Sequence, residues 1–237
     1  MNDALELKWG FHMFSLVLRE WAAQHSADPL AKRFEQDIFE DLKANTAEAH
    51  YLASCFSEDG DMLSQWRAYA DDAKGFAVGF DNTAVSILLK VCYDPGEQWS
   101  EISAWLDDLF RKYFLREGEP SSYPWDVALV VMYGDLAAYK NQAFQEEREV
   151  RAFRRMRYIS EPGVRRLRVE DFPEQTIDFA IRHGVPIPYM DYEFPSHKIR
   201  EVVIGPRNPS TPEQISVYLN TKGIEGVAVR KSAASLR

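Results

Sequence analysis

A polar loop between two apolar stretches is the first place in this sequence where side chains could do chemistry. The segment YLASCFSEDGDMLSQWRAYADDAKGFAVGF (residues 51–80) begins and ends with strand-like residues and is polar between them. A loop that is held by two buried strands can present its side chains at a fixed cleft. The candidate cofactor-binding residues of this segment are Ser57, Ser64, Trp66, Arg67 and Tyr69.

The two aromatic residues of this loop have helical spacing. Trp66 and Tyr69 are three residues apart, so they would form one aromatic face of a helical turn. Such a face can stack on a nicotinamide, an adenine or a sugar. The alternative is that both rings fill the core beneath the loop, as aromatic side chains often do. The sequence leaves both interpretations open.

A second candidate is a pair of carboxylates in the segment FQEEREVR (residues 144–151). On a strand, Glu147 and Glu149 would project from one face with Cα atoms about 6–7 Å apart. Such carboxylates compete for ionisation and could stabilise a sugar oxocarbenium ion, activate a hydroxyl or act as general acid and base. They are the candidate catalytic residues, and Arg151 is a further candidate cofactor ligand. The alternative is an ion-pair ladder with Arg151 and with arginines of a neighbouring strand.

Other chemical patterns are absent from the sequence. The five histidines show no HxxxH or HExxH spacing, and neither a nucleophile elbow GxSxG nor a phosphate-binding glycine loop is present. We therefore expect no metal. Cys55 and Cys92 are too few for a disulfide framework, and we expect Cys55 to be a small buried side chain in a strand.

Charge is unevenly distributed along the 237 residues. The net charge is −9, but residues 148–168 contain eight arginines and two acids, a local charge of +6 that leaves −15 elsewhere. An acidic body repels nucleic acid at long range, although an arginine belt could hold a phosphate or a dinucleotide. The alternative is that these arginines lie on the solvated faces of two strands. No apolar stretch can span a bilayer and no signal peptide begins the chain, so we expect a cytoplasmic protein without a membrane partner.

Hydrophobic periodicity predicts the elements that position these residues. We expect helices at 5–25, 29–49, 64–69, 82–90, 99–116, 124–140 and 211–222. We expect strands at 51–58, 75–80, around Cys92, after Phe144, and at 165–172, 176–182, 198–206 and 226–232. This order predicts one α+β domain over residues 1–237, with a mixed, mainly antiparallel sheet and a helical insertion at about 99–140.

Four segments together resemble a bacterial family, the domain of unknown function 2971. CFSEDGDMLSQWRAYADDAKGFAVGFD is similar to its first signature, and AFQEEREVRAF is similar to its second, F-x-x-E-x-E-x-R. IREVVIGP and VAVRKSAASLR resemble its closing strands. The resemblance runs over nearly the whole chain.

That family is distantly similar to ADP-ribosyltransferases, which split the nicotinamide–ribose bond of NAD. The resemblance implies a sheet core like theirs, with NAD as substrate. It places Ser57, Trp66 and Tyr69 beside the nicotinamide and makes Glu149 the catalytic carboxylate. It also implies an acceptor for the ADP-ribose, a protein or a nucleic acid, that the sequence does not identify.

The N-terminus departs from the family pattern. Family members usually begin with a His-Tyr-Thr strand, whereas this sequence begins at MNDALE, so we expect either an internal Met1 or a shortened member. Three functions remain open. The first is a NAD-dependent ADP-ribosyltransferase-like glycosyltransferase, such as a bacterial toxin or defence effector. The second is a non-catalytic module that binds a nucleotide, another ligand or a partner. The third is a glycoside hydrolase using the two glutamates, ranked last because carboxylates on one strand do not flank a bond from opposite sides.

Overall fold

The described part of the chain forms two compact units. The computed structural model describes residues 4–85, 88–117, 124–161, 164–169, 175–182 and 184–234. Unit 1 spans Met1–Cys55, Leu89–Gln145 and Arg151–Met190, and unit 2 spans Phe56–Leu88, Glu146–Val150 and Asp191–Arg237. Each unit therefore combines segments that are distant in the sequence. The single-domain organisation stays a prediction.

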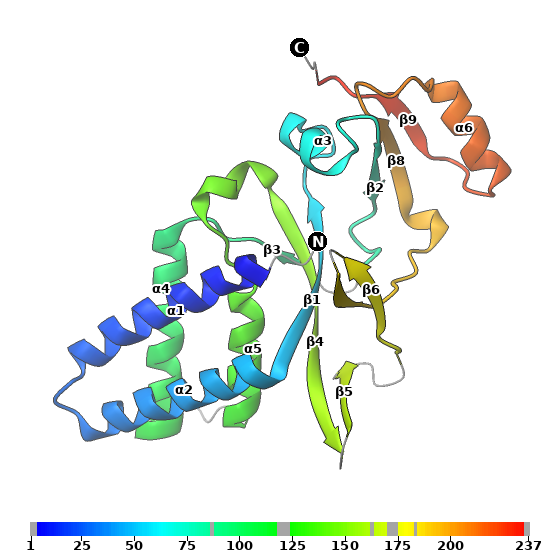
Figure 1. The fold of residues 1–237 in the computed structure, drawn as a ribbon. Helices are drawn as coiled ribbons and strands as arrows, with labels where there is room; N and C mark the ends of the chain where they lie inside the picture. The colour runs from blue at the N-terminus through cyan, green and yellow to red at the C-terminus, as the bar shows by residue number, and fades with distance from the viewer. Residues whose placement is uncertain are drawn as a thin grey trace. The chain divides into compact units, whose positions relative to one another are not determined.

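Four long helices and a π-helical turn make up most of unit 1 (Figure 1). They are α1 (Ala4–Gln24), α2 (Pro29–Glu48), α4 (Pro95–Leu109), the π-helical η1 (Phe110–Leu115) and α5 (Trp125–Leu136). Each lies within a range that the sequence predicted to be helical, except for the first residues of α1 and α4. Helix α4 begins where it does because Asp94 accepts a hydrogen bond from the backbone N–H of Glu97 and Pro95 follows at the first helical position.

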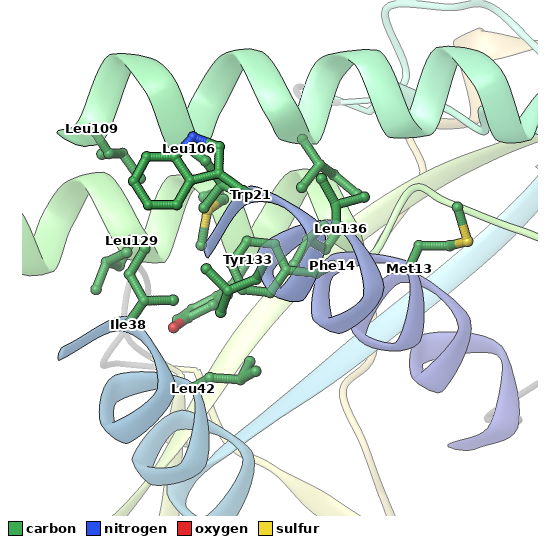
Figure 2. Close-up of a cluster of buried hydrophobic side chains, with 14 of the residues drawn as sticks. Met13, Phe14, Trp21, Ile38, Leu42, Leu106, Leu109, Leu129, Tyr133 and Leu136 are labelled. Atoms are coloured by element: carbon green, nitrogen blue, oxygen red, sulfur yellow. The ribbon is translucent and has the colours of Figure 1, made fainter. Parts of the chain in front are cut away.

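The helices of unit 1 enclose one hydrophobic core (Figure 2). Phe14, Ile38, Leu106 and Leu136 come from four different helices and are inaccessible to solvent. Burial of each such side chain contributes about 1.5–3 kcal/mol to stability. Gly10 allows α1 to approach α5, because a Cβ atom at this position would lie 2.0 Å from the carbonyl oxygen of Leu136.

A four-stranded sheet and a separate hairpin complete unit 1. The sheet contains β1 (Ala49–Ser57), β4 (Glu149–Glu161) and β3 (Leu89–Lys90) in the order β1-β4-β3, and β5 (Val164–Val169) pairs with β4 in the antiparallel sense. The hairpin joins β6 (Asp178–Arg182) to β7 (Val185–Tyr189). The arginine-rich segment runs along β4 and β5, where Arg157 and Arg168 are register partners in the ladder.

Unit 2 is built on a mixed three-stranded sheet. Strand β8 (Ile199–Ile204) is central, antiparallel to β2 (Phe76–Phe80) and parallel to β9 (Ala228–Lys231). Helix α6 (Pro212–Thr221) connects the two parallel strands, as such a pair requires. Helix α3 (Leu63–Tyr69) precedes β2, and the short 3₁₀ helix η3 (Ser196–Lys198) precedes β8. Trp66, Ala73 and Val203 form the core of this unit.

The α+β class predicted from the sequence is confirmed, but three local expectations are wrong. No helix forms among the described residues of 82–90, because the Asp81 carboxylate accepts hydrogen bonds from the backbone and hydroxyl of Thr83 and closes a turn there. Cys92 makes only an isolated bridge with Tyr139. Cys55 is exposed, since an apolar run does not reveal which positions of a strand are covered.

Candidate functional site

The two candidate segments meet in unit 2, where β1 ends and β4 begins. The Ser57 hydroxyl donates a hydrogen bond of 2.9 Å to the backbone carbonyl of Glu147. The backbone N–H of Glu58 donates one of 2.9 Å to the carbonyl of Arg148. These bonds join the loop after Ser57 to the start of β4, although 90 residues separate Ser57 from Glu147.

The geometry corrects the expectation that Glu147 and Glu149 share a strand face. Glu147 ends the 3₁₀ helix η2 (Gln142–Glu147), and Arg148 has a left-handed backbone with φ of +44°. Strand β4 begins only at Glu149. The carbonyls of residues 147 and 148 are taken by Ser57 and Glu58, so the chain turns there before it enters the ladder. The i, i+2 rule of strands therefore does not relate the two carboxylates.

Exposure separates the two glutamates further. Glu149 is 4% exposed, whereas Glu147 is half-buried. An ionised carboxylate is costly to bury unless polar groups compensate it. The Glu149 side chain is therefore surrounded mainly by protein atoms, whereas the Glu147 side chain is partly in contact with water. The Arg148 side chain is exposed and lies 3.8 Å from Glu58 and 3.9 Å from Asp59, a pairing of small energetic value.

Ser57 positions the loop that follows it. Its hydroxyl oxygen accepts a hydrogen bond of 3.2 Å from the backbone N–H of Asp59 while donating to the Glu147 carbonyl. A serine hydroxyl has one donor hydrogen and two acceptor lone pairs. Within the described part of the chain, the single donor of Ser57 is thus engaged by the Glu147 carbonyl, and one acceptor lone pair remains for a ligand.

The candidate residues of α3 have unequal exposure. Trp66 is 2% exposed and packs with Ala73 and Val203, so its ring fills the core of unit 2. Tyr69 is 50% exposed, Arg67 is exposed and Ser64 is half-buried. The expected aromatic face is therefore divided: the Trp66 ring is covered, and only Tyr69 offers a ring to solvent.

Asp61 organises this region, although no local sequence motif indicates it. Its carboxylate accepts hydrogen bonds from the Trp66 indole at 2.8 Å, from Arg230 at 3.0 Å, from the backbone N–H of Ala233 at 2.7 Å and from the Ser232 hydroxyl. Burial alone would raise the pKa of Asp61, but these hydrogen bonds outweigh it and lower the pKa. The partners lie up to 172 residues away, beyond the reach of any local motif.

A strained turn follows α3. Asp71, Asp72 and Ala73 have φ values of +48°, +51° and +68°, and each left-handed non-glycine residue costs on the order of 1–3 kcal/mol. The carbonyl of Ala73 accepts a hydrogen bond of 3.1 Å from the backbone N–H of Arg207. Gly205 permits this approach, since a Cβ atom there would lie 2.4 Å from the same carbonyl oxygen. The segment after β8 thus holds the turn in place.

The remaining candidate residue, Arg151, lies in unit 1. Its guanidinium donates a hydrogen bond of 2.8 Å to the carbonyl of Ala137, and the side chain is 1% exposed. Such burial suits a structural role. Among the described residues, no group of three or more histidine, cysteine, aspartate or glutamate side chains is arranged to hold a metal ion. None of the described helices combines the length and the apolar character needed to cross a bilayer.

Comparison with known proteins finds a match to a family model. The model of a protein family of unknown function (DUF2971) matches residues 65–152, less than half of the chain. The matched segment includes Trp66 and Tyr69 at one end and Glu147, Glu149 and Arg151 at the other. Both candidate segments are therefore represented in it, although Ser57 and Ser64 lie outside. No curated protein and no solved structure matches the chain.

Proposed function

We propose that this protein is a NAD-dependent ADP-ribosyltransferase-like enzyme in which Glu149 is the catalytic carboxylate. The observation that carries the proposal is the junction of unit 2, where Ser57 and Glu58 bind the carbonyls of residues 147 and 148. This junction brings the two candidate segments together and precedes the buried Glu149 by one residue. A bacterial toxin or a defence effector is the role that we propose for such an enzyme.

The proposed reaction breaks the bond between nicotinamide and ribose in NAD. The bonding electrons leave with nicotinamide, and positive charge develops on the ribose. A preorganised carboxylate near the ribose stabilises that charge, and it does so more strongly where water is excluded. A nucleophilic group of the acceptor, a protein or a nucleic acid, then bonds to the ribose and loses its proton.

The exposed residues of α3 would hold the substrate. Tyr69 presents an aromatic ring on which a nicotinamide or an adenine can stack. Arg67 is exposed on the same short helix and can pair with a phosphate of NAD. The half-buried Glu147 would supply a second carboxylate near the positive charge that develops on the ribose. Trp66 would act from the core by orienting Asp61, to which its indole is hydrogen-bonded.

The substitution Glu149→Gln tests the catalytic assignment. It keeps the shape and polarity of the side chain and removes its charge. We expect nicotinamide release from NAD to fall by about two orders of magnitude or more, as on the loss of one electrostatic group of an active site. Glu146→Gln is the matched control, because Glu146 is exposed three residues earlier, and it should leave the rate unchanged. An unchanged rate in the Glu149 variant would remove Glu149 from the mechanism.

A second function, a non-catalytic module that binds a nucleotide or another ligand, is favoured by a different observation. Trp66 is buried, and the only hydroxyl donor of Ser57 is engaged. Two of the three residues expected to contact the nicotinamide, Trp66 and Ser57, therefore have their ring or donor hydrogen engaged in contacts within the protein. This reading predicts that NAD at about 100 times its dissociation constant stabilises the protein by about 2.7 kcal/mol without releasing nicotinamide. Thermal unfolding and a nicotinamide assay on one sample distinguish the two functions.

A further inference from the structure

A cavity lies between two helical segments of unit 1 and shares no residue with the junction described above. Its volume is about 170 Å³. One wall is the α4–η1 segment and the other is α5. The lining residues include Trp105, Asp108, Lys112, Tyr113, Val131 and Asp135, together with the buried Leu109 and Met132. A cavity of about 150 Å³ can hold a benzene molecule, so this one suits a ligand of similar size.

The two aromatic side chains that line the cavity, Trp105 and Tyr113, each pack against a second aromatic ring. The Trp105 ring is stacked on Tyr139, with ring centroids 6.2 Å apart and planes 9° from parallel. The Tyr113 ring packs edge-on against Trp125 at 5.3 Å. Tyr113 lies in the π-helical turn η1, a rare form of helix that occurs frequently at functional sites. The cavity is therefore lined by rings whose positions are fixed.

The cavity is lined by more carboxylates than ammonium groups: Asp108 and Asp135 against Lys112. Asp108 is paired with Lys112 at 2.7 Å and with Arg111 at 3.0 Å. These pairs use the only ammonium group among the lining residues. Asp135, by contrast, has no hydrogen-bond or ion-pair partner for its side chain within the described part of the chain. Burial and the nearby Glu101 raise the pKa of Asp135, which is a sign of an uncompensated carboxylate.

We propose that this cavity binds a small organic ammonium ion with an apolar body. The ammonium group would pair with Asp135 beside the Trp105 ring, where a charge-assisted hydrogen bond and a cation–π contact act together. The apolar body would lie over Leu109 and Met132 towards Tyr113. An anion of the same shape would be repelled by the Asp135 carboxylate, and a neutral molecule would leave the negative charge of that carboxylate uncompensated.

Calorimetric titration of the full chain with 2-phenylethylammonium chloride and with 2-phenylethanol tests the proposal. The two probes have nearly the same shape and differ in charge. We expect the ammonium ion to bind about tenfold more tightly than the alcohol or better. The substitution Asp135→Asn should abolish this preference. The control Asp126→Asn removes the same charge from an exposed position of α5 and should retain the preference.

Three results would overturn the proposal: equal affinity for the two probes, no binding of the ammonium ion, or a preference that survives in the Asp135 variant. The Asp135 variant removes an unpaired, partly buried carboxylate, so it should fold at least as stably as the parent, and its melting temperature verifies this. The cavity shares no residue with the Glu149 junction, so the outcome is independent of the proposed enzymatic function.

Discussion

Two carboxylates of unit 2 illustrate how differently the same functional group can be used. Glu149 is buried at the start of β4 and is the carboxylate that we propose to be catalytic. Asp61 is tied by four groups, three of them from the C-terminal segment after β8, and holds α3 against that segment. Its role is structural, and it can be tested by its effect on stability.

Asp61→Asn should destabilise unit 2 by about 1–3 kcal/mol, because an amide cannot accept from all of these donors and leaves buried ones unsatisfied. Hydrogen exchange of the backbone amides of β2 and β8 at increasing denaturant concentration measures the difference. Asp59→Asn is the control: Asp59 accepts a local bond from the backbone N–H of Asp61, which an asparagine can also accept, and its exposed ion pair with Arg148 at 3.9 Å is of small energetic value. A loss of less than 0.5 kcal/mol, the usual effect of a neutral surface change, would contradict the role of Asp61.

The same residue gives a pH dependence with a defined sign. Because the pKa of Asp61 is lower in the folded protein than in the unfolded chain, its contribution to stability is complete above the unfolded pKa of about 3.9. That contribution is lost as the pH falls through the folded pKa. The stability difference between the parent and Asp61→Asn should therefore be constant near neutral pH and shrink below about pH 4. A difference that grows on acidification would be inconsistent with this carboxylate.

At the scale of elements, the close contact between α1 and α5 depends on Gly10, which has no side chain. Gly10→Ala places a Cβ atom 2.0 Å from the Leu136 carbonyl oxygen, so the helices must separate. We expect a loss of about 1–3 kcal/mol despite the better helix propensity of alanine. Gly134→Ala in α5 is the matched control, since a Cβ atom there meets nothing within 4 Å. Thermal unfolding should show the control to be stabilised by up to about 1 kcal/mol, and equal effects of both variants would refute the close contact.

At the scale of the whole molecule, the two units have separate hydrophobic cores. The core of unit 1 contains side chains such as Phe14 and Leu106, and the core of unit 2 centres on Trp66 and Val203. Local stability follows local packing. Hydrogen exchange should therefore show that Gly10→Ala lowers the protection of α1, α4 and α5 and leaves that of β2 and β8 unchanged, while Asp61→Asn does the reverse. Parallel losses in both units would mean that they unfold together.

Helices and strands could be predicted from the sequence where a local hydrophobic pattern marks them. The apolar stripe of Phe14, Leu18 and Trp21 predicted α1, and the apolar run of residues 202–204 predicted β8, because periodicity marks the buried face of an element. The left-handed Arg148 broke the strand expected around Glu147, and no periodicity signals that turn. It exists because two groups from 90 residues away bind the neighbouring carbonyls.

For the candidate site, the sequence by itself determined which residue types were present and where: the two glutamates around the start of β4, the serine that ends β1, the aromatics that follow it, and the absence of a histidine metal motif. Only the tertiary structure decided their roles. It covered Trp66, exposed Tyr69, separated Glu147 from Glu149 and recruited Asp61. The physical reason is that burial and hydrogen-bond partners arise from contacts between distant segments, whereas spacing along the chain records only neighbours.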